Sequence, residues 1–175
     1  MFKLLTDVIL HLRLKKKLKS FNAEPKHQVK VFKTMAIIIP EDCLVDEGVF
    51  VALSKILNIS TNRVTILMFS KKKKLKKKST FKNVIYCTRK QLTFFGDFPL
   101  ETRAVFKKKF DLLVNYFSEQ SVFPELISIN FNSKLRIGFL EANHQINDIV
   151  LDLKLDQTDL FLNESEKYLN STLKQ

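Results

Sequence analysis

Seven lysines within eight residues form the most distinctive chemical feature of this sequence. Residues 71–78 read KKKKLKKK and directly follow an apolar run of strand length. Ammonium groups so close together repel one another, so the segment is typical of a clamp for the phosphates of RNA, DNA or lipid headgroups. Lysine binds phosphate as a point charge without reading bases, and the alternative is a solvated loop that aids solubility. The candidate polyanion-binding residues are Lys71, Lys72, Lys73, Lys74, Lys76, Lys77 and Lys78.

A second group of lysines ends an apolar N-terminal segment, residues 1–21. Its apolar side chains recur at helical spacing and include Leu4, Leu5, Val8, Ile9 and Leu12. Three roles stay open for the predicted helix: docking on its own domain or in the groove of a partner protein, lying on an anionic membrane surface, or gripping nucleic acid. The candidate anion-binding residues of the helix are Lys15, Lys16, Lys17 and Lys19.

Residues suited to acid–base or metal chemistry are few. Asn115 interrupts the apolar run at residues 111–117, and Glu141 and His144 follow the next run, so these three form a candidate ligand edge if both runs are parallel strands. No nucleophile stands beside a base in a known motif, and no catalytic residue is predicted. The three histidines and two cysteines lack the spacing of metal ligands, so neither a metal site nor a cofactor is expected.

Charge is distributed very unevenly along the 175 residues. Lys and Arg total 30 against 18 Asp and Glu, a net charge of +12. Residues 63–90 carry eleven basic and no acidic side chains, whereas residues 111–175 carry five basic and ten acidic ones. Such asymmetry indicates an anionic partner or a solubility device rather than a particular fold. Only three glycines occur, none near another, which excludes a glycine-rich nucleotide loop.

The compartment expected from composition is the cytoplasm. Two cysteines exclude a disulfide-stapled scaffold and fit reduced thiols. Asp7 and His11 interrupt the apolar run near the N-terminus, and lysines follow where a signal peptide would be cleaved. No stretch approaches the roughly 20 apolar residues of a membrane span, so any membrane contact is expected to be peripheral, at the inner surface.

Apolar runs alternate with amphipathic segments from residue 32 onward. Strands are predicted at residues 32–40, 63–70, 83–88, 111–117, 134–140 and 149–153, and helices at residues 46–59, 100–110, 122–130 and 157–173. Continuous apolar strands separated by helices indicate a mostly parallel sheet covered on both faces. We predict an α/β, Rossmann-like, three-layer domain at residues 31–175 with five or six strands, preceded by a basic helix and linker at residues 1–30. Phe81, Tyr86 and Phe94 are expected to fill its core, with stacking on bases as the alternative.

Several local motifs resemble known families. The strand at residues 66–70 running into lysines, the pair Phe95-Gly96, the run at 110–116, and residues 136–139 followed by Asn147-Asp148 resemble a small bacterial family of unknown function. That resemblance implies a basic N-terminus and a one-domain α/β body, and no activity. Residues 111–116 (DLLVNY) and 136–139 (RIGF) are also similar to the N-terminal half of heptosyltransferase-type glycosyltransferases. This second resemblance implies a Rossmann-like fold but no transferase activity, because that family's nucleotide-sugar site lies mostly in a second domain.

Two functions follow from these residues. The first is a non-enzymatic module that presents its lysines to RNA, to a ribosome or to an acidic membrane. The alternative is a small or degenerate enzyme that binds a phosphorylated or nucleotide-sugar ligand at the carboxyl edge of the sheet, near Lys71, Lys72, Asn115, Glu141 and His144. We favour the first, because the chain offers charge in quantity but no paired catalytic groups. The oligomeric state stays open.

Overall fold

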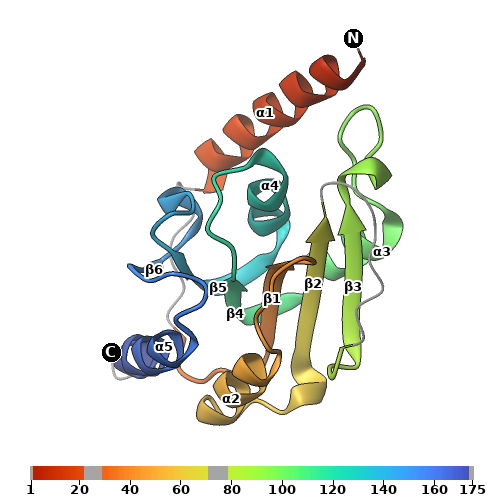
Figure 1. Ribbon diagram of the computed structural model, residues 1–175. Helices are drawn as coiled ribbons and strands as arrows, with labels where there is room; N and C mark the ends of the chain where they lie inside the picture. The colour runs from red at the N-terminus through yellow and green to blue at the C-terminus, as the bar shows by residue number, and fades with distance from the viewer. Residues whose placement is uncertain (1, 22–28, 71–78, 174–175) are drawn as a thin grey trace.

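A sheet of six parallel strands forms the centre of the protein. The structure is a computed structural model that describes residues 2–21, 29–70 and 79–173. The strands lie in the order β3-β2-β1-β4-β5-β6, which is the order of the Rossmann fold (Figure 1). Their bounds are β1 Met35–Pro40, β2 Val64–Ser70, β3 Asn83–Thr88, β4 Lys109–Asn115, β5 Asn132–Phe139 and β6 Ile149–Leu151. The predicted α/β class with a mostly parallel sheet of five or six strands is therefore confirmed, and the sheet has six strands that all run parallel.

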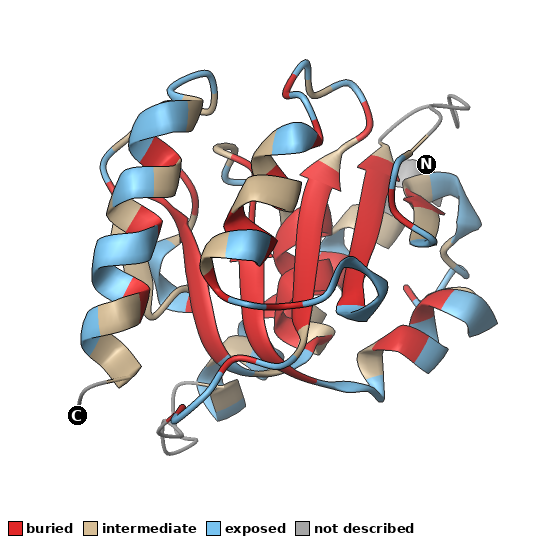
Figure 2. Ribbon diagram, turned by 90° about the horizontal axis from the view of Figure 1, so that it is seen from below, coloured by how far each residue is buried: buried red, intermediate tan, exposed pale blue. Residues whose placement is uncertain are grey.

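Helices cover both faces of this sheet, as the apolar strands require. One face carries α2 (Gly48–Ile56) and α5 (Thr158–Leu173), which bury Phe50 and Phe161 against the strands. The other carries α3 (Leu100–Phe106) and α4 (Val122–Asn130), and α1 (Phe2–Phe21) packs on α4 as an outer element (Figure 1). Figure 2 shows that the central strands are buried, while α2 and α5 expose their outer sides. Helix α4 has no exposed side, because α1 covers it. Three short 3-10 turns, η1 (Thr61–Arg63), η2 (Arg89–Gln91) and η3 (His144–Ile146), join elements.

The start of the sheet differs from the prediction at two places. β1 begins at Met35 rather than at residue 32, because the Asp111 carboxylate accepts the backbone N–H groups of Lys33 (2.8 Å) and Thr34 (3.1 Å). The helix predicted at residues 100–110 ends at Phe106, and β4 begins at Lys109. Phe110 is buried beside the Phe131 ring in the strand, so tertiary packing overrides the local helical pattern there.

A buried arginine ties β5 to the end of α4. Arg136 is only 4% exposed. Its guanidinium donates to the carbonyl oxygens of Ser128 and Phe131, each at 2.7 Å. The last carbonyls of a helix lack partners within the helix, so this contact caps α4 and places a cation at its negative end. The ring of Phe21 at the end of α1 covers the guanidinium carbon at 4.5 Å.

Candidate functional site

The predicted lysine-bearing helix α1 docks on its own domain. Leu10 and Leu14 are buried against α4 and the strands beneath it. Three polar contacts hold the helix along its length: an ion pair between Asp7 and Arg89, the Arg13–Asp97 pair at 2.9 Å, and the Lys17 ammonium donating to the Asn130 side chain at 2.7 Å. Because Arg89 follows β3 and Asn130 ends α4, α1 starts near the carboxyl edge of the sheet and runs along α4.

The apolar stripe expected to dock is not the one that does. Val8 and Leu12 belong to the predicted stripe but are 56% and 63% exposed. Leu10 and Leu14 dock instead, and a turn of 3.6 residues places them on the side of the helix opposite Val8 and Leu12. The helix therefore has apolar side chains on two faces, and only one of them is covered by the described residues.

A loop beside the first half of α1 carries two exposed aromatic rings. A Cβ on Gly96, whose φ is +81°, would lie 2.6 Å from a Leu10 methyl group, so only glycine permits this close approach. The neighbouring Phe94 is 41% exposed and Phe95 is 64% exposed, with ring centroids 5.4 Å apart. The expectation that Phe94 fills the core is wrong, because its loop lies outside the sheet, whereas Phe81 is buried and Tyr86 is half-buried.

The lysines of α1 divide into engaged and unengaged groups. Lys15, Lys16 and Lys19 are exposed, and within the described part of the chain no carboxylate lies within ion-pair distance of them. Lys17 instead contacts Asn130, and desolvation together with the Arg13 charge lowers the pKa of its ammonium group. With respect to the described residues, three of the four predicted lysines of this helix thus have no carboxylate partner and present their charge to solvent.

The lysine octad, Lys71 to Lys78, lies outside the described residues. The structure does place the residues on either side of it. Ser70 ends β2 at the carboxyl edge of the sheet. After the octad, Ser79 Oγ, Thr80 N and Thr80 Oγ1 donate to Glu47 Oε2 at 2.7–2.9 Å, which anchors the chain beside the start of α2.

Asn115 lies at the carboxyl end of β4, at the predicted edge, but its side chain is fully buried. Its Nδ2 donates to Asn147 Oδ1 at 2.7 Å. Both amides lie above Gly138 of β5, where a Cβ would approach Asn147 to 2.5 Å. Folds with this strand order bind ligands in the crevice between β1 and β4. In this protein, the Asn115 side chain at that crevice contacts Asn147.

Glu141 and His144 lie in the turn after β5, and both are exposed. His144 Nε2 lies 2.7 Å from the Leu140 carbonyl oxygen, so this nitrogen carries the proton. Nearby, the buried Glu125 of α4 accepts from the Asn143 amide at 2.8 Å, and burial raises the pKa of its carboxyl group. The sequence reasoning missed Glu125, which carries no local signal because its environment comes from residues far along the chain.

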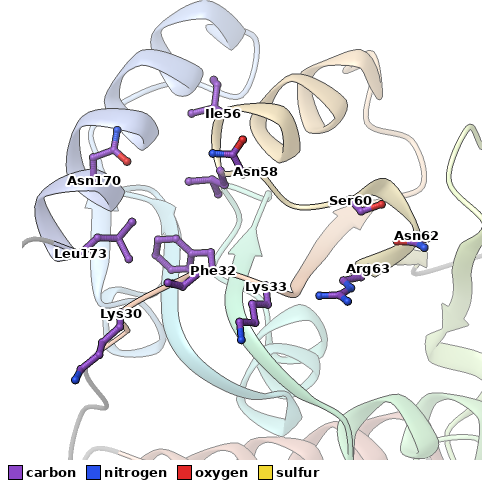
Figure 3. Close-up of a pocket in the computed structure, with 12 residues that line it drawn as sticks. Lys30, Phe32, Lys33, Ile56, Asn58, Ser60, Asn62, Arg63, Asn170 and Leu173 are labelled. Atoms are coloured by element: carbon purple, nitrogen blue, oxygen red, sulfur yellow. The ribbon is translucent and has the colours of Figure 1, made fainter.

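Hollows occur near these elements among the described residues. One of about 290 Å³ lies where the end of α1 meets the end of α4 and the start of β5, and Lys17 and Arg136 belong to its lining. A small one of about 260 Å³ lies between α1 and the loops after β3 and β4. A larger one of about 490 Å³ lies at the amino edge of the sheet, opposite the edge where Rossmann-like folds bind ligands (Figure 3). Lys30, Lys33 and Arg63 are the charged residues of its lining, and they come from the segment before β1 and from η1. Sequence reasoning missed this hollow because its residues share no local spacing.

The described residues offer little for other chemistry. Among them, no group of three or more His, Cys, Asp and Glu side chains is arranged to hold a metal ion. Burial raises the pKa of the Cys87 thiol to about 11, which keeps it protonated at neutral pH. In the same ranges, none of the helices combines the length and apolar character needed to cross a membrane.

A parallel sheet in Rossmann order, with a lysine-bearing helix docked on one helical layer, defines the protein as a Rossmann-like α/β protein. The chain belongs to a family of unknown function (DUF6913), whose profile matches residues 7–171. This confirms the expected membership in a family of unknown function with a one-domain α/β body. No curated protein and no solved structure matched the chain. The resemblance to heptosyltransferase-type enzymes stays a prediction.

Proposed function

We propose that the protein is a non-enzymatic binding module that contacts an anionic partner, RNA or an acidic membrane surface, through its lysine-rich segments. The observation that carries this proposal is the exposure of Lys15, Lys16 and Lys19 with no carboxylate within ion-pair distance among the described residues. A protein retains uncompensated charge at low cost only in solvent or against opposite charge. The composition of the octad adds seven further ammonium groups, and the whole chain carries +12.

The state of the carboxyl edge supports a binding role over catalysis. Several polar side chains described there bind one another or the backbone: Asn115 pairs with Asn147, Asn143 with Glu125, and His144 with the Leu140 carbonyl. General acid–base catalysis needs a titratable group within reach of a substrate proton. Glu125, whose pKa is raised, is 5% exposed and engaged by Asn143. We place the module in the cytoplasm, where its two cysteines stay reduced.

The test is binding across a salt series. The protein is titrated with single-stranded RNA and with vesicles rich in phosphatidylglycerol, from about 50 to 500 mM NaCl. Each phosphate that a lysine neutralises on RNA steepens the slope of log K against log salt by about 0.7. Replacing the seven octad lysines with serine, or Lys15, Lys16 and Lys19 with serine, flattens that slope or weakens vesicle binding by about fivefold per lysine.

A matched control removes the same charge elsewhere. Three exposed lysines lie at the amino edge of the sheet: Lys107 and Lys108 between α3 and β4, and Lys109 at the start of β4. The variant with serine at these three positions has the same net charge as the triple α1 variant and should bind like wild type. Absent or salt-independent binding to both RNA and vesicles would overturn the proposal. A thermal shift with nucleotides or sugar nucleotides and no polyanion binding would support the enzymatic alternative.

A further inference from the structure

The outward face of α1 combines exposed apolar side chains with lysines. Val8 and Leu12 are separated by about one turn and are 56% and 63% exposed. Lys15, Lys16 and Lys19 continue the same side of the helix toward its C-terminus. Single exposed leucine or valine side chains are common on protein surfaces. Here the two apolar side chains share one helix face with three exposed lysines. That combination is typical of helices that lie in the interface of an anionic bilayer.

We propose that the α1 surface, defined as Val8, Leu12, Lys15, Lys16 and Lys19, docks on an anionic phospholipid bilayer. This inference rests on the proposed function and names its partner. Phosphate and glycerol groups of acidic lipids meet the ammonium groups, while the upper acyl region accepts the aliphatic side chains. Nucleic acid offers equal charge, but its stacked bases give no apolar environment to Val8 and Leu12. Membrane binding therefore accounts for the exposed lysines and for the exposed apolar side chains, whereas RNA binding accounts for the lysines alone.

The helix presents this surface without leaving its domain. Leu10 and Leu14 remain buried, and the pairs Asp7–Arg89 and Arg13–Asp97 fix the helix from its inner side. The interface is therefore preformed, and binding does not require ordering of α1. Insertion is shallow, because only the outer side chains of one helix can enter the bilayer. The lysines at the C-terminal end of α1 supply the electrostatic part of the affinity.

The absence of tryptophan in the chain makes a direct test of insertion available. Leu12→Trp places a single indole on the α1 surface, and Leu160→Trp places one on α5, across the sheet, as the control. With vesicles of phosphatidylcholine and phosphatidylglycerol, the emission of Leu12→Trp should shift to the blue and be quenched by brominated acyl chains. The emission of Leu160→Trp should stay unchanged.

A second measurement separates this inference from the proposed function. Val8→Ser combined with Leu12→Ser should lower partitioning into the same vesicles by about tenfold, leave RNA binding unchanged, and leave the melting temperature within error, since both residues are exposed. Leu160→Ser is the matched control and should partition like wild type. If wild type binds these vesicles but the variants bind equally and the indole shows no shift, the inference is wrong and the charge-based proposal stands. Binding to RNA but not to vesicles would also refute the inference and leave the charge-based proposal standing. Binding to neither RNA nor vesicles would refute the inference and the proposal together.

Discussion

Gly138 lies at the carboxyl edge of the sheet, where there is no room for a side chain larger than hydrogen. It lies on β5 beneath the Asn115–Asn147 amide pair, and both asparagines belong to the buried or half-buried interior. The space for a side chain at this position is already filled by Asn147. Packing and hydrogen bonding are therefore coupled at one point of the sheet, so a single methyl group should disturb both.

Gly138→Ala should destabilise the protein by about 1–3 kcal/mol, because the new Cβ would displace Asn147 and break its bond to Asn115. Urea denaturation measures the loss. Gly48→Ala is the control, since a Cβ at Gly48 meets only the Asp46 side chain, at 3.4 Å, and alanine favours the helix that starts there. Equal stability of the Gly138 and Gly48 variants would contradict the packing argument.

At the amino edge of the sheet, Asp111 makes the free energy of unfolding depend on pH. Burial raises the pKa of its carboxyl group, but the Lys134 ammonium at 2.6 Å and the N–H of Lys33 outweigh burial and hold the pKa below its ordinary value of 3.8. A carboxylate whose pKa is lower in the folded state stabilises the fold above its unfolded pKa, and this stability is lost as pH falls through the folded pKa.

Asp111→Ala should therefore cost about 2–4 kcal/mol at pH 7, since it leaves the backbone donors of Lys33 and Thr34 without their acceptor. The difference from wild type should shrink as pH is lowered below about 3.8, where the wild-type carboxylate becomes protonated. Chemical denaturation at a series of pH values measures this difference. The exposed Asp152, changed to alanine, is the control, and a pH-independent difference for Asp111→Ala would refute the assignment.

Helix α1 has two apolar faces with different environments. The face that carries Leu10 and Leu14 is used for docking, and the face that carries Val8 and Leu12 meets solvent. Which face docks depends on contacts that only the fold supplies, among them the close approach of Gly96 and the pair between Asp7 and Arg89. Docking and partner binding, treated as alternatives from the sequence, are compatible in the structure.

Leu14→Ala should destabilise the docked helix by about 2–4 kcal/mol, because it leaves a cavity between α1 and α4. Leu12→Ala should change stability by less than about 0.5 kcal/mol, because its side chain is already exposed. Amide hydrogen exchange over residues 6–21, combined with thermal unfolding, measures both effects. Faster exchange after Leu12→Ala than after Leu14→Ala would show that the docking face is assigned wrongly.

The sequence predicted the elements better than their bounds or contacts. Apolar runs such as residues 35–40 are buried on both sides of the sheet, so composition alone identifies them as strands. The sequence predicts the end of α3 four residues too late and the start of β4 two residues too late, because the lysines before Phe110 suit a helix as well as a strand. The surroundings of Glu125 and Asn115 could not be predicted, since their partners, Asn143 and Asn147, come from a separate loop.

At the scale of the whole molecule, net charge opposes compaction. Thirty basic side chains face eighteen acidic ones, and the described ion pairs are few and mostly exposed. Exposed pairs add little stability each, so repulsion among the remaining cations is largely uncompensated. Screening by salt should relieve it, because the Debye length falls from about 30 Å at 0.01 M to about 8 Å at 0.15 M.

The melting temperature should therefore rise by a few degrees between about 10 and 150 mM NaCl. Replacing the seven octad lysines with serine should reduce this rise, because it removes more than half of the net charge of +12. Differential scanning calorimetry in a low-salt buffer measures both. An identical salt response of the variant and wild type would mean that the octad charges do not contribute to the repulsion.

The long reach of the contacts that hold α1 has a consequence for synthesis. Lys17 and its partner Asn130 are 113 residues apart, and Arg13 and Asp97 are 84 apart. At about 5–20 residues per second, translation leaves the first helix without α4 for on the order of ten seconds. During that interval the nascent chain displays Leu10 and Leu14 as well as Val8 and Leu12. Helix α1 therefore docks on its own domain late in synthesis, and until then its apolar side chains are exposed to other molecules at the ribosome exit.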